Sequence, residues 1–164
     1  MATVHLKGTP LQTIGTLPTV GSHAPDFTLT ASDLSDKSLK DFSGKNIILN
    51  IFPSIDTGTC ATSVRTFNKT AASLDNTKVL CISRDLPFAH KRFCGAEGIE
   101  DVISLSDISG DFGKAYQLSF ADGPLKALFS RSIVVINTKG EVVYTEQVSE
   151  TTNEPNYEAA LASL

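Results

Sequence analysis

The stretch FPSIDTGTC, residues 52–60, holds a proline, a threonine and a cysteine spaced as Pro-x-x-x-Thr-x-x-Cys. These residues are Pro53, Thr57 and Cys60, and they follow the apolar run NIILNI. A helical pattern begins near Gly58, which places Cys60 in the first turn of a helix. Unpaired backbone N–H groups and the helix dipole favour an anion there. A thiolate is such an anion, so this turn can hold a nucleophilic cysteine.

The two other residues of the motif suit that chemistry. The Thr57 hydroxyl can cap the helix or form a hydrogen bond in the space above the sulfur. Pro53 has no backbone N–H, so it ends the strand pairing and stiffens the turn. However, a buried cysteine in an ordinary strand–helix turn fits the same residues, because free cysteines are commonly small core residues. The motif by itself leaves both interpretations open.

The surrounding pattern predicts one α/β domain over residues 1–164. Two short segments around Gly8-Thr9-Pro10 indicate an N-terminal hairpin extension within about residues 1–17. The rest predicts a central mixed sheet flanked by helices. We expect strands at the end of GSHAPDFTLTA and over 46–52, 78–83, 101–107, 131–137 and 141–148, and helices from 58, over 87–98, near 112–116 and from about 155.

Composition narrows the class of protein. The chain has 164 residues and is 41% hydrophobic, enough for one domain with a sizeable core. No window approaches the ~18 apolar residues that cross a bilayer, and the N-terminus lacks the apolar segment of a signal peptide. We therefore expect a soluble, cytoplasmic protein. The net charge is −4 without a basic stripe, which argues against nucleic-acid binding.

Three cysteines, Cys60, Cys81 and Cys94, argue against a structural disulfide framework, because their number is odd. Cys81 lies within a predicted strand, so we expect a buried structural thiol. No Cys-x-x-Cys occurs, and the three histidines lack the spacing of metal ligands: His5, His23 and His90. We therefore expect no metal site. We also expect a solvated His90, although it lies four residues before Cys94 and can share its helical face.

The motif and the strings around it resemble the peroxiredoxins, and among them the bacterial thiol peroxidases, an atypical two-cysteine branch. The resemblance extends over essentially the whole chain. Asn137 departs from it, at a turn position where an acidic residue is common. The strings, in order, are LNIFPSIDTGTCATSVRTFN, VLCIS and DLPFA with Arg84 between them, RFCGAEG and ADGPLKALFSR.

The resemblance implies a role for each site residue. Cys60 would be the peroxidatic cysteine, whose thiolate attacks a hydroperoxide and becomes a sulfenic acid. Cys94 would be the resolving cysteine, which forms an intramolecular disulfide with Cys60. Thr57 and Arg131 would donate to the peroxide, with Pro53 completing the motif. Without the resemblance, an arginine at the start of a strand is typical of the surface.

Cys60 and Cys94 lie on different predicted helices, whereas a disulfide needs Cα atoms within about 7 Å. We therefore expect one or both first turns to unwind during turnover. The aromatic residues Phe88 and Phe93 are expected in the core, although the resemblance allows Phe88 to line an apolar rim that faces the substrate.

The same resemblance implies a thioredoxin-like fold, a homodimer, and thioredoxin as the external reductant. It implies no bound cofactor, metal or haem, and no G-x-G-x-x-G fingerprint for NADPH occurs. It favours organic hydroperoxides over hydrogen peroxide. Two other functions remain open. A protein disulfide reductase normally needs Cys-x-x-Cys, but Thr57 stands at the first of those positions. A redox sensor would need no rapid turnover.

Overall fold

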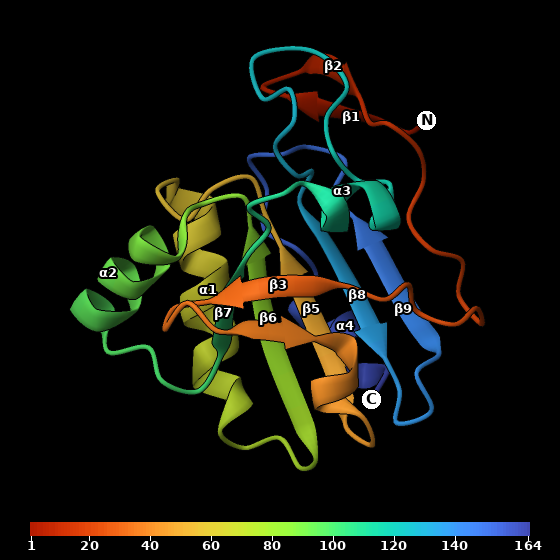
Figure 1. Ribbon diagram of the computed structural model, residues 1–164. Coiled ribbons are helices and arrows are strands. Elements are labelled where there is room, and N and C mark those ends of the chain that lie inside the picture. The colour runs from red at the N-terminus through yellow and green to blue at the C-terminus, as the bar shows by residue number, and fades with distance from the viewer.

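A seven-stranded mixed sheet runs through the computed structural model, which describes residues 1–164 (Figure 1). The strand order is β4-β3-β7-β6-β5-β8-β9. A separate two-stranded hairpin precedes the sheet. The strands are β1 (Thr3–Leu6), β2 (Thr9–Gln12), β3 (Thr28–Ala31), β4 (Asp36–Ser38), β5 (Asn46–Ile51), β6 (Thr77–Ser83), β7 (Ile103–Ser106), β8 (Ser132–Ile136) and β9 (Val142–Gln147).

The helices cover both faces of this sheet. α1, α2 and α4 contribute side chains to the hydrophobic cluster on one face of the sheet, and α3 contributes to the cluster on the other. Figure 1 shows where these helices lie along the sheet. A short 3₁₀ helix, η1 (Leu39–Phe42), precedes β5. No helix is long and apolar enough to cross a membrane. The bounds are α1 (Gly58–Ala71), α2 (Pro87–Glu97), α3 (Asp111–Tyr116) and α4 (Tyr157–Ala162).

Strand direction brings the chemically important segments to one edge of the sheet. β5, β6 and β7 are parallel neighbours, so the turns that follow them meet at the same edge. β8 is antiparallel to β5, with Ser132 opposite Ile51. The start of β8 therefore lies beside the end of β5. This topology places Arg131 next to the turn that leads into α1.

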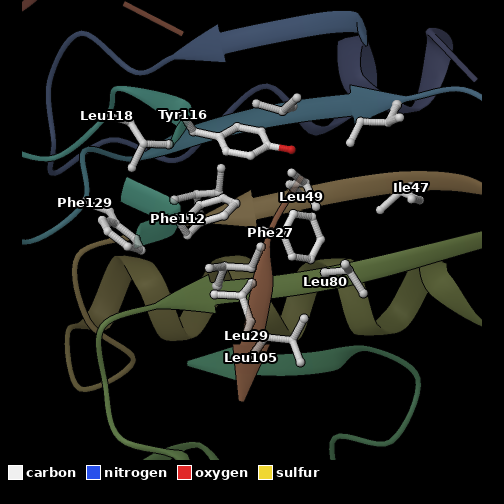
Figure 2. Packing of buried hydrophobic residues seen from close by; sticks show 14 of the residues in the cluster. Phe27, Leu29, Ile47, Leu49, Leu80, Leu105, Phe112, Tyr116, Leu118 and Phe129 are labelled. Carbon is white, nitrogen blue, oxygen red and sulfur yellow. The ribbon is translucent and has the colours of Figure 1, made fainter. Parts of the chain in front are cut away.

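Apolar residues fill both faces of the central strands. The side chains of β5, NIILNI, are buried alternately on the α1 side of the sheet and in an aromatic cluster on the opposite side. Burial on both faces suits this nearly continuous apolar run. In that cluster the Phe112 and Tyr116 rings stack with centroids 4.4 Å apart, and Phe27 meets Phe112 edge-on at 5.7 Å (Figure 2). A Cβ on Gly113 would lie 2.7 Å from the Phe129 ring, so this packing requires glycine there.

The predicted α/β architecture is confirmed, with small differences at its boundaries. The hairpin turn lies at Lys7 and Gly8, both with positive φ, rather than at Gly8-Thr9-Pro10. The third parallel strand is shorter than the predicted 101–107. The expected helix over 87–98 ends at Glu97, because Gly98 adopts a left-handed φ of 66° as its cap. The sequence does not predict β4, because its three residues are all polar and show no alternation of apolar and polar side chains.

Candidate active site

Cys60 is the third residue of α1 and is fully buried. Thr57 is the N-cap in extended conformation, and the Ala61 N–H donates the first helical hydrogen bond to its carbonyl at 3.0 Å. The N–H groups of Gly58, Thr59 and Cys60 precede that bond and lie outside the helical ladder. The sulfur thus sits at the positive end of the helix dipole, where an anion is stabilised.

The Thr57 hydroxyl does not cap the helix. It donates a hydrogen bond to the Ser54 carbonyl at 3.0 Å, within the turn. Of the two predicted roles of this hydroxyl, helix capping is therefore wrong, because the side chain is turned toward the Ser54 carbonyl and accepts no N–H of α1. The lone pairs of its oxygen remain able to accept a hydrogen bond. Pro53 is buried at the end of the strand, as the first residue of this turn.

Arg131 is buried beside the sulfur and is only 2% exposed. Its Nη2 lies 3.4 Å from Cys60 Sγ. Nε and Nη2 also donate to the Thr151 carbonyl, at 3.1 and 2.9 Å, while Nη1 is buried without a partner. The residues around Arg131 by themselves favour a surface position, and this expectation is wrong. The antiparallel direction of β8 places the arginine beside the start of α1. The guanidinium stabilises a thiolate and holds one donor free.

The N-terminal hairpin supports the loop that orients Arg131. The His5 N–H donates to the Ser149 carbonyl, and the Thr151 N–H donates to the His5 carbonyl, both at 2.7 Å. On the other side of the loop, the Thr59 hydroxyl donates to the Thr152 carbonyl at 3.0 Å. The loop is therefore fixed between β1 and the first turn of α1, which sets where the Thr151 carbonyl points.

Glu150 adds a second attachment to the hairpin. Its carboxylate accepts hydrogen bonds from the Lys7 N–H at 2.9 Å and the Gly8 N–H at 3.0 Å. The bond from Gly8, followed by that from Lys7, lowers the pKa of Glu150 to about 2. Sequence reasoning missed Glu150 and Thr151, because their partners in the hairpin lie far away along the chain. The two Glu150 bonds span 143 and 142 residues. The only signal was a set of C-terminal glutamates, which is typical of a solvated face.

We expect the hairpin attachment to weaken in acid. Because the folded pKa of Glu150 lies below its ordinary 4.5, the stabilisation is complete above pH 4.5 and is lost as pH falls toward about 2. Glu150→Gln should therefore lower the free energy of unfolding near neutral pH, and this difference from the wild type should shrink in acid. Urea unfolding across this range measures it. Glu158→Gln, at an exposed site of α4, is the control, and an equal effect of both variants would contradict the role of Glu150.

Cys94 lies away from Cys60, although all three cysteines are free thiols. Its Sγ is 3.4 Å from the Ser104 hydroxyl on β7, and burial raises the pKa of this half-buried thiol. Arg131, which contacts Cys60, directly precedes β8. Two strands, β5 and β6, lie between β7 and β8, so Cys94 and Cys60 contact segments that are not neighbours in the sheet. No disulfide joins them in this conformation.

The prediction that Cys81 is buried is confirmed. Its sulfur accepts a hydrogen bond from Asn50 Nδ2 at 3.7 Å, and burial raises the pKa of the thiol to about 12. A thiol with so high a pKa stays protonated and unreactive at neutral pH. No group of three or more His, Cys, Asp or Glu side chains is arranged to hold a metal ion.

Two expectations about α2 are wrong. His90 is only 1% exposed instead of solvated, because Ser83 supplies a polar partner that allows burial of the imidazole. Phe88 is 64% exposed instead of in the core, because it points outward from the first turn of α2. Phe93 is half-buried and packs against the core, beneath the Arg65 guanidinium at 5.5 Å.

Comparisons with known proteins agree with this arrangement. The model of the Redoxin family matches residues 19–161. The chain is 56% identical to a thiol peroxidase of Mycobacterium tuberculosis, strain ATCC 25618 / H37Rv, and 51% identical to one of Corynebacterium glutamicum. Both alignments cover 100% of this chain and 99% of the relative.

Solved structures share the fold. A peroxiredoxin-like protein from Aquifex aeolicus superposes with a TM-score of 0.93 at 34% identity, over 98% of this chain and 95% of that one. A thiol peroxidase from Chromobacterium violaceum gives 0.90 at 23% identity, over 98% and 93%. The thioredoxin-like fold is thus confirmed. The chain belongs to the Redoxin family, and within that family it is a thiol peroxidase.

Proposed function

We propose that this thiol peroxidase reduces hydroperoxides through Cys60, resolves the product with Cys94, and is regenerated by thioredoxin. The observation that carries the proposal is the environment of one sulfur. Cys60 Sγ lies at the start of α1, 3.4 Å from Arg131 Nη2, and the neighbouring Nη1 is buried without a partner. No other cysteine of the chain lies at the start of a helix or beside a buried arginine.

In the first step the Cys60 thiolate attacks one oxygen of the hydroperoxide. The S–O bond forms as the O–O bond breaks, which yields a sulfenic acid, and the leaving oxygen takes up a proton to depart as water or an alcohol. Negative charge develops on that oxygen, so fixed donors accelerate the step. Arg131 Nη1 and the N–H groups at the start of α1 supply those donors. The Thr57 hydroxyl oxygen accepts a hydrogen bond from the O–H group of the hydroperoxide.

In the second step the Cys94 sulfur attacks the Cys60 sulfenic sulfur. A disulfide forms, and the sulfenic oxygen leaves as water. Cys94 must travel from Ser104 across two strands, so α2 and the first turn of α1 have to unwind locally. Gly95 and Gly98, on the C-terminal side of Cys94, ease that opening. A dithiol of the thioredoxin type then reduces the disulfide, and no bound cofactor takes part.

We also propose a homodimer that buries the apolar surface near this edge of the sheet. Leu86, Phe88 and Ile108 are each more than half exposed, at 54%, 64% and 52%. Arg84 donates to the Ile108 carbonyl at 3.3 Å, which places Ile108 beside the segment leading into α2. A reducing compartment such as the cytoplasm suits the free thiols of this cycle.

Two matched variants test the role of Cys60. Cys60→Ser and Cys81→Ser both replace a fully buried cysteine, so their structural costs are comparable. We expect Cys60→Ser to abolish peroxide-dependent NADPH oxidation in the presence of thioredoxin and thioredoxin reductase, whereas Cys81→Ser keeps near-normal activity. Full activity of Cys60→Ser would sink the proposal. If dithiothreitol supports turnover of the wild type and thioredoxin does not, the proposed reductant is wrong.

A further inference from the structure

A buried hydrogen-bond network joins the helix that carries Cys94 to the turn that carries Cys60. His90, one helical turn before Cys94, lies 3.0 Å from the Ser83 hydroxyl through its Nε2. Ser83 donates to Asp85 Oδ2. Asp85 in turn accepts from the Ser54 hydroxyl and from the Ile55 N–H, both at 2.7 Å. The network thus runs from α2 through the end of β6 into the turn between Pro53 and Thr57.

The hydrogen-bond count fixes which nitrogen of His90 carries the proton. Ser83 has one hydroxyl proton and donates it to Asp85, whose carboxylate offers no proton in return. The Ser83 oxygen also accepts from the Asp85 N–H at 3.1 Å. His90 Nε2 must therefore be the donor in its bond to Ser83. Its Nδ1 is then a bare acceptor, buried without a partner.

The two ring nitrogens act in opposite directions on the stability of α2. The Nε2–H bond holds the helix in place while α2 stays wound. The orphaned Nδ1 costs free energy in the wound state and regains water when α2 opens. Burial lowers the pKa of His90, against the opposing charges of Asp85 and Asp56, so the ring stays neutral. The bond from His90 Nε2–H to Ser83 therefore anchors α2, but the free energy lost when it breaks is partly offset by the hydration of Nδ1.

Two ion pairs also hold α2, one to the Cys60 turn and one to α1, and both are exposed. Arg92 pairs with Asp56 at 2.6 Å, and Arg65 pairs with Glu97 at 2.8 Å, but these side chains are 36–66% exposed. Exposed ion pairs contribute little, typically about 0.2–1 kcal/mol. The buried network is therefore the dominant polar link between α2 and the Cys60 turn.

We propose that His90 is a positioning residue for the resolving step, which rests on the proposed roles of Cys60 and Cys94. Its bond to Ser83 keeps α2 wound, with Cys94 against Ser104, while Cys60 reacts with hydroperoxide. Rupture of this bond releases Cys94 toward the sulfenic acid. The strength of this bond thereby sets which of two reactions the Cys60 sulfenic acid undergoes. It either forms the disulfide with Cys94, or a second hydroperoxide oxidises it to sulfinic acid and leaves as water or an alcohol.

Ser83→Ala tests the bond from its acceptor side. It leaves His90 Nε2–H buried without a partner, and a cost of this kind is relieved when α2 opens. We expect Cys60–Cys94 disulfide formation to be faster by about three- to tenfold, and less sulfinic acid per turnover. The rate constant for the first oxidation of Cys60 should stay within about twofold of the wild type. Rapid acid quench, alkylation and mass spectrometry measure all three quantities.

Three further variants distinguish the loss of the Ser83–His90 hydrogen bond from a general loss of stability. His90→Gln keeps an amide donor and should resolve at nearly the wild-type rate. The double variant Ser83→Ala/His90→Met replaces both partners by apolar groups and should return toward the wild type. Ser106→Ala is the matched control, because Ser106 is buried opposite Ser83 on β7 and its hydroxyl has no partner. It should leave resolution unchanged.

Several results would overturn the proposal. It fails if Ser83→Ala resolves no faster than the wild type, or if Ser106→Ala resolves equally fast. A disulfide other than Cys60–Cys94 would instead disprove the proposed resolving cysteine. Hydrogen exchange of the reduced wild type gives a test without a variant. The amides of residues 90–97 and 54–56 should open together with one free energy, and separate opening would contradict the network.

Discussion

Arg131→Met is expected to slow the reaction of Cys60 with hydroperoxide by about 100- to 1,000-fold, the usual cost of removing one preorganised donor. Arg131 supplies the charge 3.4 Å from the sulfur and a buried Nη1 amino group that has no partner. Methionine can replace only the aliphatic part of the arginine side chain, and it supplies neither the charge nor a hydrogen-bond donor. The second-order rate constant, measured by rapid mixing of the reduced protein with hydrogen peroxide, tests this directly.

Arg131→Lys separates charge from geometry. Lysine keeps the positive charge but cannot donate to the Thr151 carbonyl and to a peroxide in the fixed fork of a guanidinium. Its rate constant should therefore fall between those of the wild type and Arg131→Met. Thermal unfolding of both variants checks that the fold is retained. A folded Arg131→Met with the wild-type rate constant would show that the arginine has no part in peroxide cleavage.

Cys94→Ser is expected to stop turnover after the first equivalent of hydroperoxide. Cys60 would still form its sulfenic acid, because Cys94 has no contact with Cys60 or Arg131 in the reduced state and instead meets Ser104. Without the resolving thiol, the sulfenic acid has no partner within the chain, since Cys81 is fully buried in the sheet. Further hydroperoxide should then drive Cys60 to sulfinic acid.

Intact mass spectrometry after stepwise addition of hydroperoxide follows this sequence. The variant should gain one oxygen and then a second, whereas the wild type should lose two hydrogens. The rate constant of the first step should be the same in both chains. Sustained thioredoxin-dependent turnover of Cys94→Ser at the wild-type rate would mean that another group resolves the sulfenic acid.

The sequence predicts the position of Cys60 well, because local features determine it. An apolar run, a proline that ends the strand and a helical pattern from Gly58 together place the cysteine in the first turn of a helix. The buried strand around Cys81 is equally local. These features follow from residues within a few positions of each other, so periodicity and turn chemistry are sufficient to predict them.

The rest of the site depends on strand topology, which the sequence does not reveal. Arg131 reaches Cys60 only because β8 is antiparallel to β5. This pairing cannot be read from the residues around Arg131, which by themselves suggest a surface position. The support from Thr151 and Glu150 depends on the hairpin docking against the loop at 149–152. Burial of His90 likewise requires Ser83, which is brought to it by the end of β6. Each is a long-range contact without a local signal.

The disulfide formed by the wild type tests the proposed mechanism most directly. The reduced protein is treated with one equivalent of hydroperoxide, quenched with an alkylating agent and mapped by peptide mass spectrometry. We predict a single intramolecular disulfide between Cys60 and Cys94, with Cys81 recovered as the free thiol. A disulfide that includes Cys81, or recovery of Cys60 as the unoxidised thiol, would contradict the roles proposed for these three residues.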